Sequence, residues 1–415
     1  MASTPHDAGE RRGLLAWIEK RFPLRALIES QLTHYYAPKN LNAWYYFGVI
    51  ALVLLVSQFA TGIVLAMFYK PGEATAFDSV EYIMREVPWG WLIRYLHSTG
   101  ASAFFIVVYL HMFRALLYGS YQRPRELLWI LGMLVYLALM AQAFMGYVLP
   151  WGNLSFWGAQ VIVSLFGTIP VIGPDLVDWI RGDYGISEST LGRFFSLHVV
   201  AVPLALALLV TLHIIALHTT GSNNPDGVEL KEKLGADGKP LDGIPFHPYY
   251  TVKDLLSIAA FLTVFAVVMF FIPILGGLFL ESPNFEPANP ASTPEHIAPV
   301  WYFTPFYAIL RAVPDQRTGA LLMLLAVVSF LFLPWLDRSP VRSARYKGWL
   351  SRFFLAMFAI SFVALGHLGL QPAEGKYVLL ARFFGVFYFA FFWLMPLYTR
   401  AERVKALPER LSVHS

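Results

Sequence analysis

The sequence predicts an all-α polytopic membrane protein with eight transmembrane helices, four in an N-terminal bundle and four after it. Of its 415 residues, 57% are hydrophobic, 16% are aromatic and only 14% are charged, and the mean hydropathy is +0.54. One water-soluble core cannot enclose so much apolar surface, so lipid must be part of the surroundings. The second observation is a set of eight apolar runs, each long enough to cross a bilayer, which takes about 20 residues.

These runs divide the chain into domains. They are residues 41–69, 91–118, 127–149, 194–218, 255–280, 319–336, 349–370 and 377–398. We therefore expect five parts, which are a leader (1–40), a four-helix transmembrane domain (41–220), a loop (221–254), a C-terminal transmembrane domain (255–400) and a tail (401–415).

The distribution of basic residues predicts the orientation. The net charge is only +4, but lysine and arginine concentrate in the leader, in the tail and in the loops that follow the second, fourth and sixth spans. Because basic residues favour cytoplasmic loops, both termini are expected to be cytoplasmic. The leader has no secretory cleavage site, which predicts an amphipathic segment that stays on the membrane surface. Its basic residues are Arg11, Arg12, Lys20, Arg21 and Arg25.

Two loops on the opposite side are too long to be simple connectors. They are residues 150–193 and 281–318, both rich in apolar and aromatic residues with many Pro and Gly. Loops of this length are usually functional. We expect short interfacial helices in them, at 154–165 and 303–312.

The chain has no cysteine. This excludes structural disulfides, thiolate metal sites, iron–sulfur clusters held by this chain and covalently attached c-type haem. Any redox centre must therefore rest on histidine.

Four histidines lie inside the second and fourth apolar runs. His97 and His111 are 14 residues apart, which on a helix is a rise of roughly 21 Å and about 40° short of four turns, so both rings leave one face. His198 and His213 are 15 apart, about 60° past four turns. Both helices start from the same side, so the histidines pair at two depths. Two imidazoles at one depth can ligate one haem iron axially, which predicts two b-type haems between these helices.

Glycines and arginines support this interpretation. Glycines repeat the 14-residue interval on the flanking helices, where a macrocycle pressed against helix backbone needs the missing side chain. Glycine also permits close helix packing, but two pairs at one interval favour the haem site. One arginine lies one turn before His97 and another lies three residues after His111, each toward the nearer membrane surface. Both would meet haem propionates, although snorkelling to the interface explains them too. These residues are Gly48, Gly62, Gly132, Gly146, Arg94 and Arg114.

Two other functions are compatible with intramembrane histidines. A diheme membrane anchor for a dehydrogenase needs only four or five helices, so the last four spans would have no role. A transporter would use the histidines and arginines as a proton or substrate path.

Several stretches resemble cytochrome b of the respiratory cytochrome bc complex, a quinol:cytochrome c oxidoreductase, along nearly the whole chain. They are WYYFG, GYVLPWG, SFWGA, RFFSLH, HTTGSNNP, FHPYYTVKD, PANP and PVWYFTPFYAILR. The resemblance implies one haem between His97 and His198 near the periplasmic side and one between His111 and His213 near the cytoplasmic side. The photosynthetic relative is similar but split after the fourth helix.

The resemblance also implies two quinone sites. At the quinol-oxidising site, on the side poor in basic residues, the matching residues are Phe144, Tyr147, Gly158, Pro299, Trp301 and Tyr302. At the quinone-reducing site, on the basic side, they are His218, Ser222, Asn223, Phe246, Lys253 and Asp254. His218 and Asp254 are of types that can deliver protons to a reduced quinone.

The chain departs from the family pattern in two places. The family's Pro-Glu-Trp-Tyr is here Pro299-Val300-Trp301-Tyr302, and valine cannot accept a proton. Another carboxylate must then help. Glu281, Glu286 and Glu295 lie on the same loop, and Glu281 is favoured because it follows directly on the fifth span. The second departure is the 15-residue interval, which Pro203 could absorb through a bulge or kink, leaving the orientation of the His213 ring open.

The implied function is bifurcated quinol oxidation in a proton-translocating Q cycle. The partners would be a Rieske-type iron–sulfur protein, a membrane-anchored c-type cytochrome, quinone, membrane lipid and a second copy of the chain, with no nucleic acid. The implied location is a bacterial inner membrane.

Overall fold

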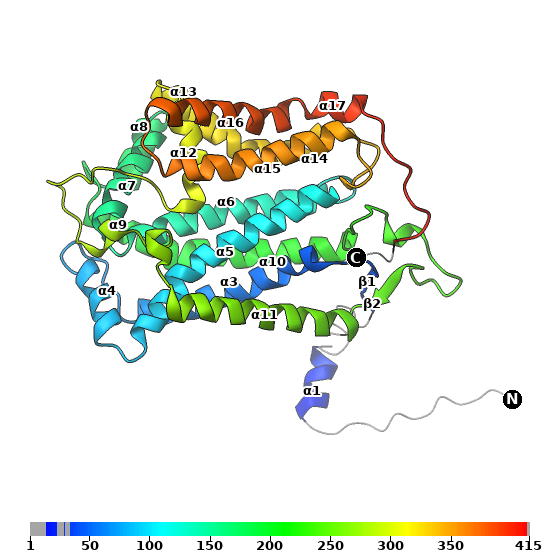
Figure 1. Ribbon diagram of the computed structural model, residues 1–415. Coiled ribbons are helices and arrows are strands. Elements are labelled where there is room, and N and C mark those ends of the chain that lie inside the picture. The colour runs from blue at the N-terminus through cyan, green and yellow to red at the C-terminus, as the bar shows by residue number, and fades with distance from the viewer. Residues whose placement is uncertain (1–13, 23–28, 30–33, 413–415) are drawn as a thin grey trace.

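A computed structural model describes residues 14–22, 29 and 34–412 of the chain (Figure 1). Within them, eight helices are long and apolar enough to cross a membrane, as the sequence predicts. They span Ala43–Ala66, Gly90–Tyr118, Glu126–Val148, Glu188–Thr220, Tyr249–Phe271, Gln316–Leu336, Trp349–Gly369 and Gly375–Trp393. The expected all-α polytopic fold is confirmed.

The first four spans form a bundle in the middle of the molecule (Figure 1). The short helix η1 (Ala43–Tyr46) leads into α3 (Phe47–Ala66), which packs along α5 (Gly90–Tyr118). The third span, α6 (Glu126–Val148), packs along α10 (Val202–Thr220). This arrangement encloses the space between α5 and the fourth span, which carry the paired histidines.

A π-helical turn, η2 (Leu197–Ala201), lies between α9 (Glu188–Ser196) and α10. The amide of Val202 donates to the carbonyl of Leu197, five residues back, where an α-helix would use four. Such a turn takes up one extra residue and is frequent at functional sites. It begins one residue before His198 and ends just before Pro203. The 15-residue interval between His198 and His213 therefore behaves like the 14-residue interval on α5.

The second half of the chain flanks the bundle. Helix α11 (Tyr249–Phe271) packs against α3 and α5 at one edge. At the other edge α15 (Trp349–Gly369) packs along α16 (Gly375–Trp393), which α17 (Met395–Ala401) follows. The sixth span consists of α13 (Gln316–Val328), η7 (Ser329–Phe332) and α14 (Leu333–Leu336).

The fifth span ends earlier than the sequence predicts, at Phe271 and not at residue 280. Pro273 cannot continue a helix, and the chain turns through η4 (Leu275–Gly277), where Gly276 and Gly277 have φ of 61° and 91°. The apolar residues up to 280 therefore belong to a turn at the end of the bundle.

Short helices cover the end of the bundle that is poor in basic residues (Figure 1). The two expected ones are present as α7 (Asn153–Phe166) and as η6 (Trp301–Phe303) with α12 (Thr304–Arg311). The sequence analysis did not anticipate α4 (Ala76–Arg85), α8 (Gly173–Arg181) or η5 (Ser282–Phe285).

The opposite end holds a two-stranded antiparallel sheet. Strand β1 (Tyr36–Pro38) pairs with β2 (Gly243–Pro245) in the register Tyr36 to Pro245, and η3 (Leu230–Glu232) lies in the same loop as β2. The tail returns to this end, where Arg410 binds Asp242. Helix α1 (Leu14–Arg21) belongs to the predicted leader, but Arg11, Arg12 and Arg25 lie outside the described residues.

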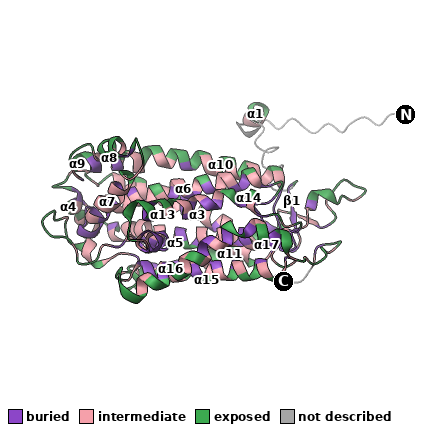
Figure 2. Ribbon diagram, turned by 90° about the horizontal axis from the view of Figure 1, so that it is seen from above, coloured by how far each residue is buried: buried purple, intermediate pink, exposed green. Residues whose placement is uncertain are grey.

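Many residues on the spans are coloured as exposed or intermediate (Figure 2), and the exposed ones include large apolar residues. Examples with more than half of their surface exposed are Leu204, Leu208, Val264, Phe271 and Val386. Contiguous exposed apolar surface on this scale does not occur on water-soluble monomers. The distribution matches a protein whose outer solvent is lipid.

Candidate functional site: two histidine pairs and the polar clusters at either end

Helix α5 and the span formed by η2 and α10 bring the four histidines together in two pairs. The ring centroids of His97 and His198 are 6.2 Å apart, with the ring planes at 83°. Those of His111 and His213 are 6.4 Å apart, with the planes at 68°. The pairing at two depths that the spacing predicts is therefore present.

These separations fit axial ligation of a metal. With a metal-to-nitrogen bond of about 2.0 Å and about 1.2 Å from nitrogen to ring centre, two axial imidazoles have centroids about 6.4 Å apart. No group of three or more His, Cys, Asp or Glu side chains gathers to hold a metal in the part of the chain that the structure describes. The pairs therefore suit a metal whose other four ligands come from a macrocycle, as in haem.

Each histidine ring lies against one of the four predicted glycines. A Cβ atom added at the glycine would meet the Cε1 atom of the ring at a distance too short for an ordinary contact. The distances are 2.4 Å from Gly146 to His198, 3.1 Å from Gly62 to His97, 3.1 Å from Gly132 to His213 and 3.3 Å from Gly48 to His111. The sequence analysis placed these glycines against the macrocycle, whereas in the structure each one makes room for an imidazole.

The outer nitrogens of two rings bind backbone carbonyls beside these glycines. His198 Nδ1 donates to the carbonyl of Gln142 at 2.8 Å, and His213 Nδ1 donates to that of Leu128 at 3.0 Å. Each carbonyl belongs to the residue four positions before the glycine (146 − 142 = 4 and 132 − 128 = 4). Donation through Nδ1 leaves Nε2 free of a proton, as a metal ligand requires.

On α5 the two rings differ from each other. The Thr61 hydroxyl donates to the carbonyl of Ser57, so it accepts from His97 Nδ1 at 3.0 Å. His111 Nδ1 is buried and has no hydrogen-bond partner among the described residues. Three of the four rings thus have a defined tautomer.

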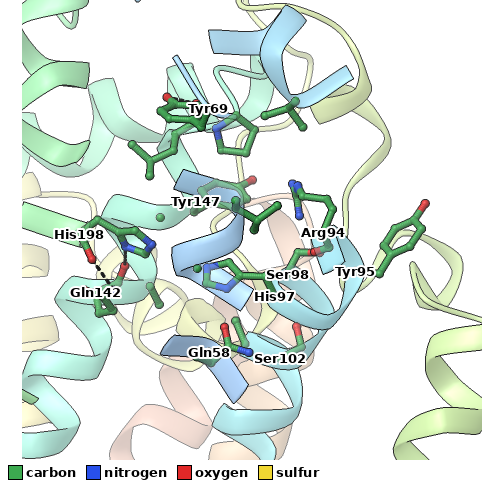
Figure 3. Close-up of a pocket in the computed structure, with 18 of the residues that line it drawn as sticks. Gln58, Tyr69, Arg94, Tyr95, His97, Ser98, Ser102, Gln142, Tyr147 and His198 are labelled. Atoms are coloured by element: carbon green, nitrogen blue, oxygen red, sulfur yellow. Dashed lines mark hydrogen bonds between the residues drawn. The ribbon is translucent and has the colours of Figure 1, made fainter. Parts of the chain in front are cut away.

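A cavity, partly open to the outside, surrounds the first pair (Figure 3). His97 and His198 face it from opposite helices, and Gly62, Gly146 and Arg94 also line it. Arg94, which the sequence analysis expects to meet a haem propionate, is thus on the same cavity as the first histidine pair. The same cavity reaches a group of residues in the loop 281–318 and the end of α6. They are Tyr147, Phe279, Asn284, Val300 and Tyr302.

A hydrogen-bonded carboxyl lies at this end of the cavity. Tyr147 donates to Glu281 Oε2 at 3.3 Å, and Asn284 donates to the Tyr147 hydroxyl at 2.8 Å and to Glu281 Oε2 at 3.3 Å. Burial raises the pKa of Glu281 to about 7. Val300, in the position of the missing glutamate, is buried among apolar neighbours.

The other residues predicted for this end are divided between the cavity and its surroundings. Tyr302 is stacked on Phe105 with centroids 3.9 Å apart, and burial raises its pKa. Trp301 donates to the Ser102 hydroxyl at 3.1 Å. Phe144 contacts Phe194 at 5.5 Å between centroids. Gly158 and Pro299 do not line the cavity, and a Cβ at Gly158 would meet open space. Glu295 is exposed, with no hydrogen bond or ion pair among the described residues.

At the other end of the bundle, the loop after α10 packs against α5. Asn223 donates to the carbonyl of Tyr118 at 2.8 Å, and Arg114 donates to the carbonyl of Asn223 at 3.4 Å. The Arg114 guanidinium lies 5.0 Å from the ring centroid of Tyr118. Arg114 and Ser222 are both buried. The structure thus brings Arg114, Ser222 and Asn223 together at the end of α5 that follows His111.

The remaining residues predicted for this end lie around His218 and the start of α11. His218 Nδ1 and Asp254 Oδ1 are buried and lack a hydrogen-bond partner among the described residues. Lys253 donates to the Tyr249 hydroxyl at 2.7 Å. Phe246 stacks on Tyr250 with centroids 6.0 Å apart. Buried polar atoms are normally hydrogen-bonded, so these two atoms are candidates to bind a polar ligand.

Sequence reasoning missed three residues of these clusters. Asn284 follows Glu281 by three residues, a spacing that a helical turn brings together, and this signal could have been used. Thr61 could have been found because it is the neighbour of the predicted Gly62. Tyr35, which stacks on His218 with centroids 4.5 Å apart, had no local signal.

Comparison with known proteins places the chain in a family. The family model "Cytochrome b/b6/petB" matches residues 32–221, and "Cytochrome b(C-terminal)/b6/petD" matches residues 287–389. The chain is 58% identical over 413 residues to "Cytochrome b" of Allochromatium vinosum, covering 98% of this chain and 100% of the relative. It is 46% identical over 411 residues to "Cytochrome b/c1" of Bradyrhizobium diazoefficiens, covering 99% of this chain and 58% of that protein.

A solved structure gives the same result. A chain of "Hyperthermophilic respiratory Complex III" superposes with a TM-score of 0.87 at 40% identity and covers 94% of this chain and 99% of its own length. Because these matches span both halves, neither a shorter diheme anchor nor a transporter accounts for the chain. The chain belongs to the cytochrome b family of the cytochrome bc complexes, whose members bind b-type haem and carry electrons in the respiratory chain.

Proposed function

We propose that this chain is a diheme subunit that oxidises quinol at one end of its bundle and reduces quinone at the other. The main support for the proposal is the presence of two histidine pairs. His97 with His198 and His111 with His213 have separations of 6.2 Å and 6.4 Å, and each ring has a glycine behind it. When bound, two haems would each accept and pass on a single electron, because axial histidines leave no position open for other chemistry.

The protein's own contribution to haem binding is orientation. Carbonyls of α6 accept from the outer nitrogens of His198 and His213. Such partners fix the tautomer and the ring orientation of a metal-ligating histidine. Arg94 lines the cavity of the first pair, where a carboxylate of the macrocycle would find a positive partner.

Quinol oxidation requires a group that accepts a proton. We assign this task to Glu281, because burial raises its pKa to about 7 and its Oε2 accepts from Tyr147 and Asn284 beside the cavity. A quinol loses two electrons and two protons. We assign one electron and one proton to a partner iron–sulfur protein, and the other proton to Glu281. The other electron would pass to a haem held by His97 and His198. Tyr302 lines the cavity and contacts Trp301, and we assign both to the same site.

Quinone reduction at the other end requires proton donors and hydrogen-bond donors. His218 and Asp254 each have a buried polar atom without a partner, and we assign them the delivery of protons. Ser222, Asn223, Phe246 and Lys253 complete the quinone-reducing site.

The partners and the orientation follow from the sequence. Because the chain has no cysteine, the iron–sulfur centre and the c-type haem must come from separate subunits. We propose a Rieske-type protein and a membrane-anchored c-type cytochrome as these partners, and a homodimer as the assembly. The basic end, with both termini, faces the cytoplasm of a bacterium.

A redox titration of the purified complex tests the proposal. The reduced-minus-oxidised absorption spectrum should resolve two b-type haems with different midpoint potentials. Addition of quinol should reduce one of them before the other. A single b-type haem would contradict the diheme function.

A further inference from the structure

We infer that Tyr35 is a positioning residue of the quinone-reducing site, where it holds the His218 ring and directs a hydroxyl hydrogen of the Tyr35–Ser222 pair at the quinone carbonyl. This inference rests on the proposed function. It assigns a role to a residue that lies 183 positions before His218 (218 − 35 = 183) and belongs to none of the recognised motifs.

The two-stranded sheet places Tyr35. Tyr35 immediately precedes β1, and the carbonyl of Tyr35 accepts from the amide of Phe246, immediately after β2, at 2.8 Å. The rings of Tyr35 and Phe246 have centroids 6.0 Å apart. The sheet therefore delivers two aromatic side chains to the same place at the end of α10.

The Tyr35 ring covers one face of the His218 ring. The centroids are 4.5 Å apart and the planes are at 9°, a parallel stack. Tyr35 has only 9% of its surface exposed. A buried stack restricts rotation of the imidazole, and His218 Nδ1 lacks a partner that would do so. Tyr35 is thus the contact that fixes the direction of the His218 nitrogens.

The Tyr35 hydroxyl belongs to a chain of hydroxyls with one hydrogen to spare. It lies 2.8 Å from Ser222 Oγ and accepts from the Ser222 amide at 3.1 Å. Tyr45 also interacts with Ser222. In an open chain of hydroxyls there is always one more O–H group than there are links. No further acceptor for these hydroxyls lies among the described residues, so one hydrogen is available to a ligand.

The surroundings suit a quinone oxygen. Burial raises the pKa of Tyr35, so its hydroxyl keeps its hydrogen at neutral pH. The positive charges of Arg114 and Arg125 act on the same place. A carbonyl oxygen that gains negative charge on reduction is stabilised by both the hydrogen bond and these charges.

Binding of ubiquinone to the purified complex tests the inference. Tyr35→Phe keeps the stack and removes the hydroxyl, Ser222→Ala removes its partner, and Tyr184→Phe is the control, because Tyr184 is fully exposed on the loop at the other end. One hydrogen bond is worth about 0.5–1.5 kcal/mol, or roughly 2- to 12-fold in affinity. We expect Tyr35→Phe to raise the Kd by this factor and to shift the infrared stretching band of a ¹³C-labelled quinone carbonyl to higher frequency.

The double variant separates positioning from general destabilisation. If the two hydroxyls act as one unit, Tyr35→Phe with Ser222→Ala weakens binding no more than the stronger single change. An unchanged Kd and an unchanged carbonyl band in Tyr35→Phe would overturn the role of Tyr35. Failure of the unmodified complex to bind quinone at this end would instead refute the proposed function, and the inference with it.

Discussion

Replacement of the four glycines by alanine should impair the two haem sites to different degrees. The largest effect is expected at Gly146, where the added Cβ would lie 2.4 Å from His198 Cε1 and 3.0 Å from both ring nitrogens. Restoring an ordinary contact of 3.4 Å requires a movement of about 1.0 Å (3.4 − 2.4). The smallest effect is expected at Gly48, where the distance to His111 Cε1 is 3.3 Å.

The magnitudes decide the sign of each change. Alanine in a helix interior is favoured over glycine by about 0.8–1.0 kcal/mol, whereas overpacking in a filled interior costs about 1–3 kcal/mol. At Gly48 the two nearly cancel. At Gly146 overpacking wins, and the His198 ring moves away from a bond that tolerates about 0.5 Å of error. Loss of such support typically lowers metal affinity about 10- to 100-fold.

Haem content measures this prediction. Each variant complex is purified, and its two b-type haems are quantified by reduced-minus-oxidised spectra and by redox titration. Gly146→Ala should lose or shift only the haem between His97 and His198. Gly385→Ala is the matched control, because Gly385 lies inside α16 and its Cβ would meet nothing within 4 Å. Equal haem content and equal potentials in Gly146→Ala and Gly48→Ala would refute the reasoning.

Three further predictions concern the carboxylates. The pKa of Glu281 is raised to about 7 by burial, so the carboxyl is protonated below that pH and can act as a base above it. The rate of quinol oxidation should therefore fall as the pH drops through 7. Glu281→Gln should oxidise quinol slowly and without this pH dependence. Glu374→Gln, a control exposed at the same end, should keep both the rate and the pH dependence. A pH profile of Glu281→Gln identical to that of the unmodified complex would remove Glu281 from the mechanism. Asp226 is fully buried and accepts from Asn40, Arg345, Tyr346 and Ser412, so Asp226→Asn should destabilise the complex by about 1–3 kcal/mol in thermal unfolding, and an unchanged Tm would contradict that. Arg410 and Lys39 lower the pKa of Asp242, so its contribution to stability is present above the pKa of the unfolded chain and is lost on acidification. Asp242→Asn should remove this part of the acid sensitivity, which stability measurements between pH 3 and 7 would detect.

The sequence predicted what depends on regular helix geometry. The intervals from His97 to His111 and from Gly132 to Gly146 are set by a fixed rise and rotation, so pairing at two depths could be foreseen. A local irregularity near Pro203 that absorbs the extra residue of the 15-residue interval could also be foreseen. Its form as a π-helical turn could not, because hydrogen-bond register there depends on packing against α6.

Contacts that depend on loop pairing could not be predicted. Tyr35 reaches His218 only because Tyr36 pairs with Pro245, more than 200 positions away. The sequence analysis favoured Glu281 as a proton acceptor because it follows the expected fifth span. That span ends at Phe271, and the intervening turn was not foreseen. Asn284 joins Glu281 through η5, a single short turn whose formation depends on its packing against α7.

The central claim is that two histidine pairs hold two haems independently. It is tested most directly by redox spectra of complexes carrying His97→Leu or His111→Leu, with His367→Leu, an exposed histidine on α15, as the control. We predict that the first variant loses one b-type haem and keeps the other, that the second shows the reverse, and that the control keeps both. Retention of two reducible haems with unchanged potentials in either paired variant would contradict the account.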